Sequence, residues 1–193
     1  MKRATYYVAT LMLCGGIITP TAVGKGTVVA ALKERHPDLR VSVSATTRPP
    51  RPGEIDGAHY HFVSDEEFDS MVESGDMLEW ALVHGRNKYG TPRRPVDRAI
   101  AQGHPVLLEI DLDGARQVRR TRPDARFVFL APPSWEELER RLVSRGTEDG
   151  AEQRRRLETA RVEMRASAEF DHIVVNDSVE RAVSELAALM GLE

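Results

Sequence analysis

The sequence predicts an α/β fold in which a parallel sheet is covered by helices on both faces. Short apolar runs alternate with helical patterns along the chain, which is typical of strands joined by crossover helices. The run at residues 105–111 is apolar until Glu109 and Asp111, which indicates a central strand with carboxylates at its C-terminal edge. Open α/β sheets bind ligands at that edge, so we expect a site there.

Each predicted element follows from a local pattern and its boundary residues. Ser64 and Glu67 predict a capping box and Gly75 a helix end, while Ser134 with Glu137 caps a later helix. Residues 145–156 are rich in arginine, glycine and acidic residues, and they predict a mobile lid. The predicted strands are 6–13, 40–44, 77–83, 105–111, 126–131 and 172–175. The predicted helices are 25–35, 65–74, one opened by Thr91 and Pro92 and ended by Gly103, one after Ser134, and 179–190.

Composition places the chain among ordinary soluble enzymes. Its 193 residues predict one domain, and 30% charged with 6% aromatic residues is typical of a globular protein. The net charge of −3 argues against a general nucleic-acid binder. Cys14 is the single cysteine, which excludes an internal disulfide and a cysteine metal site and fits a reducing cytoplasm.

The N-terminal segment has two interpretations. Residues 1–16 combine a basic start with a short apolar run and small residues, which loosely resembles a secretory or lipoprotein signal. Leu13 is too large for the usual cleavage site, so we interpret residues 6–13 as a buried strand. No run is long enough to span a bilayer, and we expect a cytoplasmic protein without a membrane partner.

The motif Gly24-Lys25-Gly26-Thr27 is the second half of a phosphate-binding loop at the start of a helix. Backbone N–H groups there would bind phosphate, Lys25 would neutralise its charge, and the Thr27 hydroxyl would face Mg²⁺ directly or through water.

The first half of this motif is unusual, because its glycine is expected at position 19, where the chain has Thr19. Either Thr19 occupies the glycine position with strain, or the strand ends near Leu13 and a loop about three residues longer starts at Gly15 and Gly16. Both accounts predict weakened ATP binding.

A second anion site is predicted in residues 42–57, SVSATTRPPRPGEIDG, where Arg48 and Arg51 lie on a proline-stiffened loop. Two guanidinium groups suit bidentate binding of a monophosphate. A chain that binds a triphosphate and a monophosphate at separate places is expected to transfer a phosphoryl group between them.

This ordered pair of motifs resembles the guanylate kinase family, from about Thr21 to the C-terminus. The resemblance implies a P-loop kinase fold and Mg²⁺-dependent transfer of the ATP γ-phosphoryl group to GMP. It implies a core of residues 1–38, 92–140 and 160–193, a GMP-binding lobe of about 39–91, and an arginine-rich lid of about 141–159. The partners it implies are small molecules, ATP and GMP, with a monomeric or homodimeric chain and no nucleic acid.

The resemblance also implies the site residues. Guanine presents N1–H and an amino group side by side, which suits a carboxylate, and Glu79 lies in an apolar strand where an unpaired charge is costly. The residues implied to bind GMP are Ser44, Arg48, Arg51, Tyr60, Glu79, Tyr89, Gly90, Thr91, Glu109 and Asp111. Those implied to bind ATP are Ala22, Val23, Gly24, Lys25, Gly26, Thr27 and Asn176, and those implied to act in catalysis are Lys25, Arg48, Arg141, Arg145 and Arg156.

Two other functions stay open from the sequence. The altered phosphate loop is compatible with a guanylate-kinase-like module that binds GMP with weak or no turnover. A kinase of another small phosphate ester would share the scaffold, but Glu79 and Asp111 argue against it.

Overall fold

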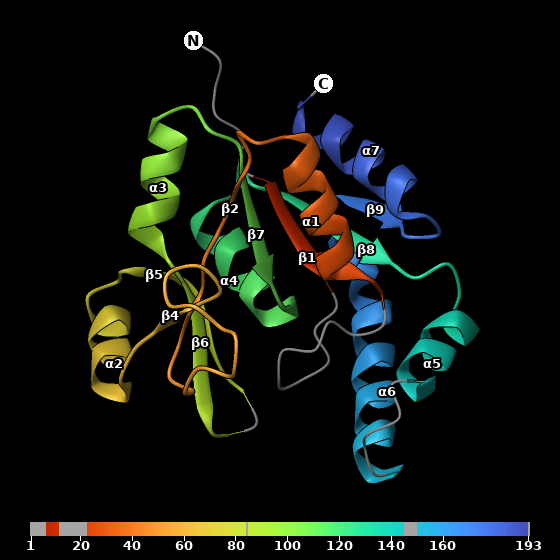
Figure 1. The fold of residues 1–193 in the computed structure, drawn as a ribbon, viewed down its shortest axis with the longest axis horizontal. Coiled ribbons are helices and arrows are strands. Elements are labelled where there is room, and N and C mark those ends of the chain that lie inside the picture. Colours follow the sequence, from red (N-terminus) through yellow and green to blue (C-terminus); the bar gives the residue numbers. More distant parts are fainter. Residues whose placement is uncertain (1–6, 12–22, 84, 145–149, 193) are drawn as a thin grey trace.

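The computed structural model describes residues 7–11, 23–83, 85–144 and 150–192, arranged as two sheets with helices around them (Figure 1). The strands are β1 (Tyr7–Leu11), β2 (Arg40–Val41), β3 (Ala45–Thr46), β4 (His61–Phe62), β5 (Met77–Val83), β6 (Asn87–Pro92), β7 (Val106–Ile110), β8 (Arg126–Ala131) and β9 (His172–Val175). The helices are α1 (Lys25–Arg35), α2 (Asp65–Glu73), α3 (Arg93–Ala101), α4 (Leu112–Thr121), α5 (Trp135–Ser144), α6 (Gly150–Arg165) and α7 (Val179–Met190), with a 3₁₀ turn at Ala166–Glu169.

The core sheet has the strand order β2-β7-β1-β8-β9, and all its neighbouring strands are parallel. Leu107 of β7 packs in a cluster with Val28 and Leu186, from α1 and α7, which lie side by side in Figure 1. Leu108 joins a second cluster with Val118 of α4. Because successive β7 residues face opposite sides of the sheet, the two clusters cover both faces. The predicted α/β fold class is confirmed.

The second sheet has the order β4-β3-β6-β5 and lies with α2 at one side of the molecule, away from α5 and α6 (Figure 1). The predicted strand at 40–44 is too long, because pairing with β7 ends after Val41 and the chain enters the second sheet at Ala45. The segment before Thr91, for which we predicted no strand, forms β6 and pairs with β5. Thr91 therefore lies on a strand, and Pro92 is the N-cap of α3.

Helix α6 covers part of the segment 145–156, for which we predicted a mobile lid and no helix. It is continuous from Gly150 to Arg165. Alanine, glutamate, glutamine and arginine dominate this segment, and they are strong helix formers even where apolar residues are few. Helix α4 was not predicted either, and it begins directly after β7 with Asp111 as its N-cap.

Several boundaries are confirmed, including α1, β5, β8, β9 and α7. In the α2 capping box, Glu67 N donates to Ser64 Oγ at 3.1 Å and Ser64 N donates to Glu67 Oε2 at 2.8 Å. The predicted Ser134 cap is present too, with Glu137 N donating to Ser134 Oγ at 3.2 Å.

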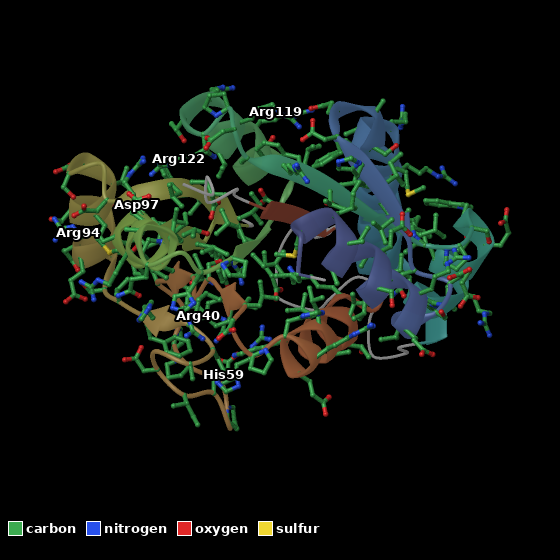
Figure 2. All side chains as sticks on the ribbon, turned by 90° about the horizontal axis from the view of Figure 1, so that it is seen from above. Arg40, His59, Arg94, Asp97, Arg119 and Arg122 are labelled. Carbon is green, nitrogen blue, oxygen red and sulfur yellow. The ribbon has the colours of Figure 1, made fainter. Side chains whose placement is uncertain are left out.

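The basic cluster formed by Arg116, Arg119 and Arg122, on α4 and at its C-cap, has structural partners. The Arg119 guanidinium lies 4.0 Å from the centroid of the Phe127 ring. Arg122 pairs with Asp97 of α3, and both residues are labelled in Figure 2. Arg116 binds Glu169 at 2.6 Å. These contacts fasten α4 to its neighbours, so the cluster is part of the folded surface.

Some expectations concern residues outside the described ranges. The end of the first strand near Leu13, both accounts of Thr19 and the placements of Ala22 and Arg145 are among them. Those expectations stay predictions. Within the described ranges, no helix has the length and apolar character needed to cross a bilayer.

Candidate active site

The start of α1 lies against the C-terminal end of β9. Gly24 is the N-cap of α1 and has φ of 81°, in the left-handed region that favours glycine. The side-chain amide of Asn176, the residue after β9, donates to the carbonyl of Val23. A Cβ at position 24 would lie 2.9 Å from Asn176 Nδ2. Glycine is therefore needed at position 24 for its backbone angle and for this close approach.

Lys25 is buried at the first position of α1, and its Nζ lies 3.1 Å from Glu109 Oε2. Glu109 belongs to β7, so this ion pair joins the phosphate-loop helix to the strand that ends at Ile110, directly before Asp111. Gly26 and Thr27 are exposed in the same helical turn. The Lys25–Glu109 ion pair places the lysine cation at the edge of the sheet where the sequence predicted a ligand.

Arg48 is buried, with 6% of its surface exposed, and is held by a carboxylate of its own loop. Its two terminal nitrogens donate to Glu54 Oε2 at 2.6 Å and Oε1 at 2.7 Å. Glu54 also accepts from the backbone N–H of Arg51 at 2.7 Å, and these bonds lower its pKa to about 2. The same pairing raises the pKa of Arg48. The Arg51 side chain is exposed.

Sequence reasoning missed Glu54. Its signal is the turn that Pro52 and Gly53 introduce after Arg51, because such a turn brings a residue three positions later back to the backbone of the first. A carboxylate in that turn is well placed to orient an arginine.

Aromatic rings surround the Arg48 guanidinium. Its Cζ lies 5.2 Å from the Tyr60 ring centroid and 5.6 Å from that of Phe62, and Tyr60 meets Tyr89 edge to face at 6.0 Å. Burial raises the pKa of Tyr60 to about 12, so its phenol stays protonated as a donor.

Two polar atoms of this cluster have no hydrogen bond of ordinary geometry within the described residues. They are Arg48 Nε and the Tyr89 hydroxyl, although Tyr89 lies close enough to Arg48 to contribute to its raised pKa. Unused buried donors are costly without a partner. The cluster therefore has hydrogen-bonding capacity for an anion such as a phosphate group.

Glu79 is buried on β5, with 7% of its surface exposed, opposite Thr91 of β6. The Thr91 hydroxyl donates to Glu79 Oε1 at 2.5 Å. Burial raises the pKa of Glu79 to about 7, and the nearby Asp111 charge adds to the rise. Near neutral pH this carboxylate is thus close to gaining or losing a proton.

Asp111 and Glu79 both approach Gly114. A Cβ at Gly114 would lie 2.8 Å from Glu79 Oε2 and 3.2 Å from Asp111 Oδ1. Asp111 Oδ1 accepts from Gly114 N at 2.7 Å, and burial raises the pKa of Asp111. The absence of a side chain at position 114 lets the two carboxylates approach each other.

Gly90 and Ser44 complete the second sheet around this pair. A Cβ at Gly90 would lie 2.7 Å from the Glu79 carbonyl oxygen and 2.9 Å from Trp80 Cβ, so only glycine fits there. Ser44 precedes β3, and its carbonyl accepts from His61 N at 2.9 Å. Gly90 lies on β6 directly before Thr91 and opposite Trp80 of β5, and Ser44 precedes the strand β3 that pairs with β6.

Of the three arginines predicted for the lid, the structure describes the side chain of Arg141. Arg141 of α5 binds Glu137 at 2.5 Å through Nε, one turn away on the same helix. Arg145 and the Arg156 side chain lie outside the described part. Their catalytic role stays a prediction.

Glu163 of α6 is a second acidic residue that sequence reasoning missed. It is 6% exposed, and its Oε2 has no hydrogen-bond partner within the described chain. Burial, with a smaller contribution from the Asp111 charge, raises its pKa to about 9. A lone glutamate in a polar helix gives no sequence signal of burial.

The parallel core, the helix-start lysine and the separate Arg48–Glu54 cluster are together typical of a P-loop nucleoside monophosphate kinase. The guanylate kinase family model matches residues 15–193. The chain belongs to the guanylate kinase family, whose members are ATP:GMP phosphotransferases.

Individual relatives agree with this assignment. The chain is 61% identical over 171 residues to a guanylate kinase of Leifsonia xyli subsp. xyli, covering 89% of this chain and 67% of the relative. It is 58% identical over 173 residues to one of Cutibacterium acnes, covering 90% and 87%. A crystal structure of guanylate kinase from Anaplasma phagocytophilum matches with a TM-score of 0.72 and 29% identity, covering 97% and 85%.

Proposed function

We propose that this chain transfers the γ-phosphoryl group of ATP to GMP, with Mg²⁺, through the residues described above. The observation that supports it best is the joint presence of two buried groups of opposite chemistry, both carried by the segment that forms the second sheet. Arg48 with its aromatic neighbours suits a phosphate, and the Glu79–Asp111 pair suits a purine that presents two donors.

On the acceptor side, Arg48, Tyr60 and Tyr89 bind the GMP phosphate through charge-assisted hydrogen bonds, and Arg51 approaches from the exposed side of the loop. Glu54 keeps the Arg48 guanidinium in place before the ligand arrives. A phosphate held in this way has one oxygen aimed at the donor.

Ionised Glu79 and Asp111 accept the guanine N1–H and amino group. The Thr91 hydroxyl fixes the orientation of Glu79, and Ser44 and Gly90 border the base. Adenine presents an acceptor at N1 in place of the guanine donor, so it would leave a buried carboxylate unpaired. This arrangement predicts a preference for GMP over AMP.

On the donor side, Lys25 and the N–H groups of the first turn of α1 bind the ATP phosphates. Lys25 then exchanges Glu109 for phosphate oxygens. Asn176 holds the Val23 carbonyl, which fixes the entry to the helix, and its contact with adenine stays a prediction.

The reaction needs no protein nucleophile. An oxygen of the GMP phosphate attacks the γ-phosphorus of ATP, the bond from that phosphorus to the ADP oxygen breaks, and GDP and ADP result. The protein contributes position and positive charge, which dominate catalysis of phosphoryl transfer. Arg141, Arg145 and Arg156 supply further charge in this proposal.

Mg²⁺ fits the residues present. It prefers oxygen ligands and keeps several water molecules and substrate phosphates in its coordination shell. The exposed residue Thr27 lies two positions after Lys25 in the first turn of α1, and its hydroxyl would hold Mg²⁺. When bound, Mg²⁺ neutralises phosphate charge. We also propose that the enzyme acts in the cytoplasm, as a monomer or homodimer.

A coupled assay of ADP release tests the proposal. With ATP and Mg²⁺, we expect rapid release in the presence of GMP, and little with AMP or with no acceptor. Equal release with AMP and GMP would contradict the base assignment, and release that no acceptor accelerates would contradict phosphoryl transfer to a nucleotide.

A further inference from the structure

Gln117 of α4 binds the edge of the second sheet with both ends of its side-chain amide. Its Oε1 accepts from Trp80 N at 3.1 Å, and its Nε2 donates to Trp80 O at 2.9 Å. Trp80 lies on β5, which is the edge strand in the order β4-β3-β6-β5. The glutamine amide thus takes the place of the backbone groups of a missing neighbouring strand.

This contact lies next to the carboxylate pair. Glu79 precedes Trp80 in β5, and its Oε2 approaches Gly114, which is three residues before Gln117 and therefore on the same face of α4. One helix face accordingly meets β5 at two adjacent points. The first point places Glu79 beside Asp111, and the second fixes the backbone that carries Glu79.

We propose that Gln117 is a positioning residue for guanine recognition, which it serves by holding the Glu79 carboxylate at its distance from Asp111. The inference rests on the proposed role of this pair in binding GMP. The reason is geometric, since α4 carries Asp111 at its N-cap and β5 carries Glu79, and the Gln117 amide is a direct polar link between the two elements.

The substitution Gln117→Met tests this role. Methionine has a similar length and helix propensity but makes neither hydrogen bond. Gln102→Met is the matched control, because Gln102 is an exposed residue at the end of α3. We expect Gln117→Met to raise KM for GMP about 3- to 10-fold, the effect of losing one or two neutral hydrogen bonds, with kcat and KM for ATP within about twofold of wild type.

A structural role alone would change binding of any purine monophosphate equally, so the informative readout is discrimination between GMP and IMP. IMP lacks the amino group that the second carboxylate oxygen would accept. We expect Gln117→Met to reduce the wild-type preference for GMP over IMP several-fold. In a Glu79→Gln background, the same substitution should leave the preference unchanged, because Gln117 acts through the Glu79 carboxylate and that variant already lacks it.

Two results would overturn the inference: unchanged discrimination in Gln117→Met, or the same loss of discrimination with and without Glu79. A wild-type enzyme that does not prefer GMP over IMP would instead contradict the proposed base site itself. Melting temperatures of all variants identify any that fail to fold. If Gln117→Met fails to fold, the Gln117→Glu variant, which keeps one acceptor for Trp80 N, takes its place in the same measurements.

Discussion

The acceptor side of the site, formed by residues 44–92 with Asp111, holds its charged groups differently from the donor side, formed by the start of α1 and Asn176. On the acceptor side, Arg48 binds Glu54 six residues away, and Glu79 binds Thr91 on the adjacent strand. On the donor side, Lys25 binds Glu109, and Asn176 binds Val23 across the fold. Acceptor recognition is thus largely organised by local pairing, whereas donor recognition depends on how distant segments meet at the sheet edge.

This difference predicts separable effects of substitution. Changes at Arg48 and Glu79 should alter use of GMP, a change at Asn176 should alter use of ATP, and a change at Glu163 should alter stability alone.

Arg48→Ala should have the largest effect. Loss of a charged hydrogen-bonding group costs roughly 1.5–3 kcal/mol, or about 10- to 150-fold in kcat/KM for GMP. KM for GMP should rise and kcat should fall together, because the same group binds and aims the phosphate. Steady-state kinetics with each substrate varied measures this, and unchanged values would remove Arg48 from the site.

Glu79→Ala should damage GMP use while leaving ATP affinity nearly intact, because guanine loses a charged acceptor. We expect roughly a 10-fold or greater loss of GMP affinity by calorimetry. Identical GMP affinity in wild type and variant would show that Glu79 does not contact the base.

The raised pKa of Glu79 adds a pH dependence to this prediction. Since the ionised form accepts the guanine donors, GMP affinity should fall as pH drops below about 7, where the carboxyl becomes protonated. A Glu79→Gln variant should lack this component when it is titrated in the same buffers, where ionisation of the GMP phosphate affects both proteins alike.

Glu163→Gln should stabilise the fold without altering recognition of either nucleotide. A carboxyl whose pKa is raised to about 9 takes up a proton on folding above its unfolded pKa, so it destabilises the folded state increasingly as pH rises from about 4.5 to 9. The variant's advantage in unfolding free energy should grow by up to about 1.4 kcal/mol per pH unit in that range. Denaturant unfolding at pH 5 and pH 8 measures it; an equal difference at both would exclude a buried titrating group.

Asn176→Ala should have the smallest effect and should act on the donor side. Loss of the hydrogen bond to the Val23 carbonyl removes about 0.5–1.5 kcal/mol of stabilisation from the entry to α1. KM for ATP should therefore rise about 3- to 10-fold. KM for GMP should stay within about twofold. A larger rise in KM for GMP than for ATP would contradict the division into two sides.

The same division explains how far the sequence could predict the site. Arg48 was predicted from two arginines on a proline-stiffened loop, and Glu79 from a charge inside an apolar strand. Thr91 was predicted only through the family resemblance. Glu54 was missed although its signal is local, because we inferred no contact between Arg51 and Glu54 from the turn that joins them.

Other features depend on contacts that no local pattern contains. The Lys25–Glu109 pair and the Gln117–Trp80 contact join residues far apart in the sequence. Burial of Glu163 depends on the packing of α6, and β6 becomes a strand by pairing with β5 and β3. The helices and strands with strong periodicity or caps were predicted well because these signals lie within the local sequence.

Binding of GMP, guanosine and AMP in the absence of ATP tests the central claim, that the acceptor side alone recognises both the phosphate and the guanine of its substrate. Guanosine lacks the group that Arg48 binds, and AMP lacks the donors that Glu79 and Asp111 accept. Calorimetric titration should give tight binding of GMP and at least about 10-fold weaker binding of each of the other two. Equal affinity for AMP and GMP, or for guanosine and GMP, would contradict the account.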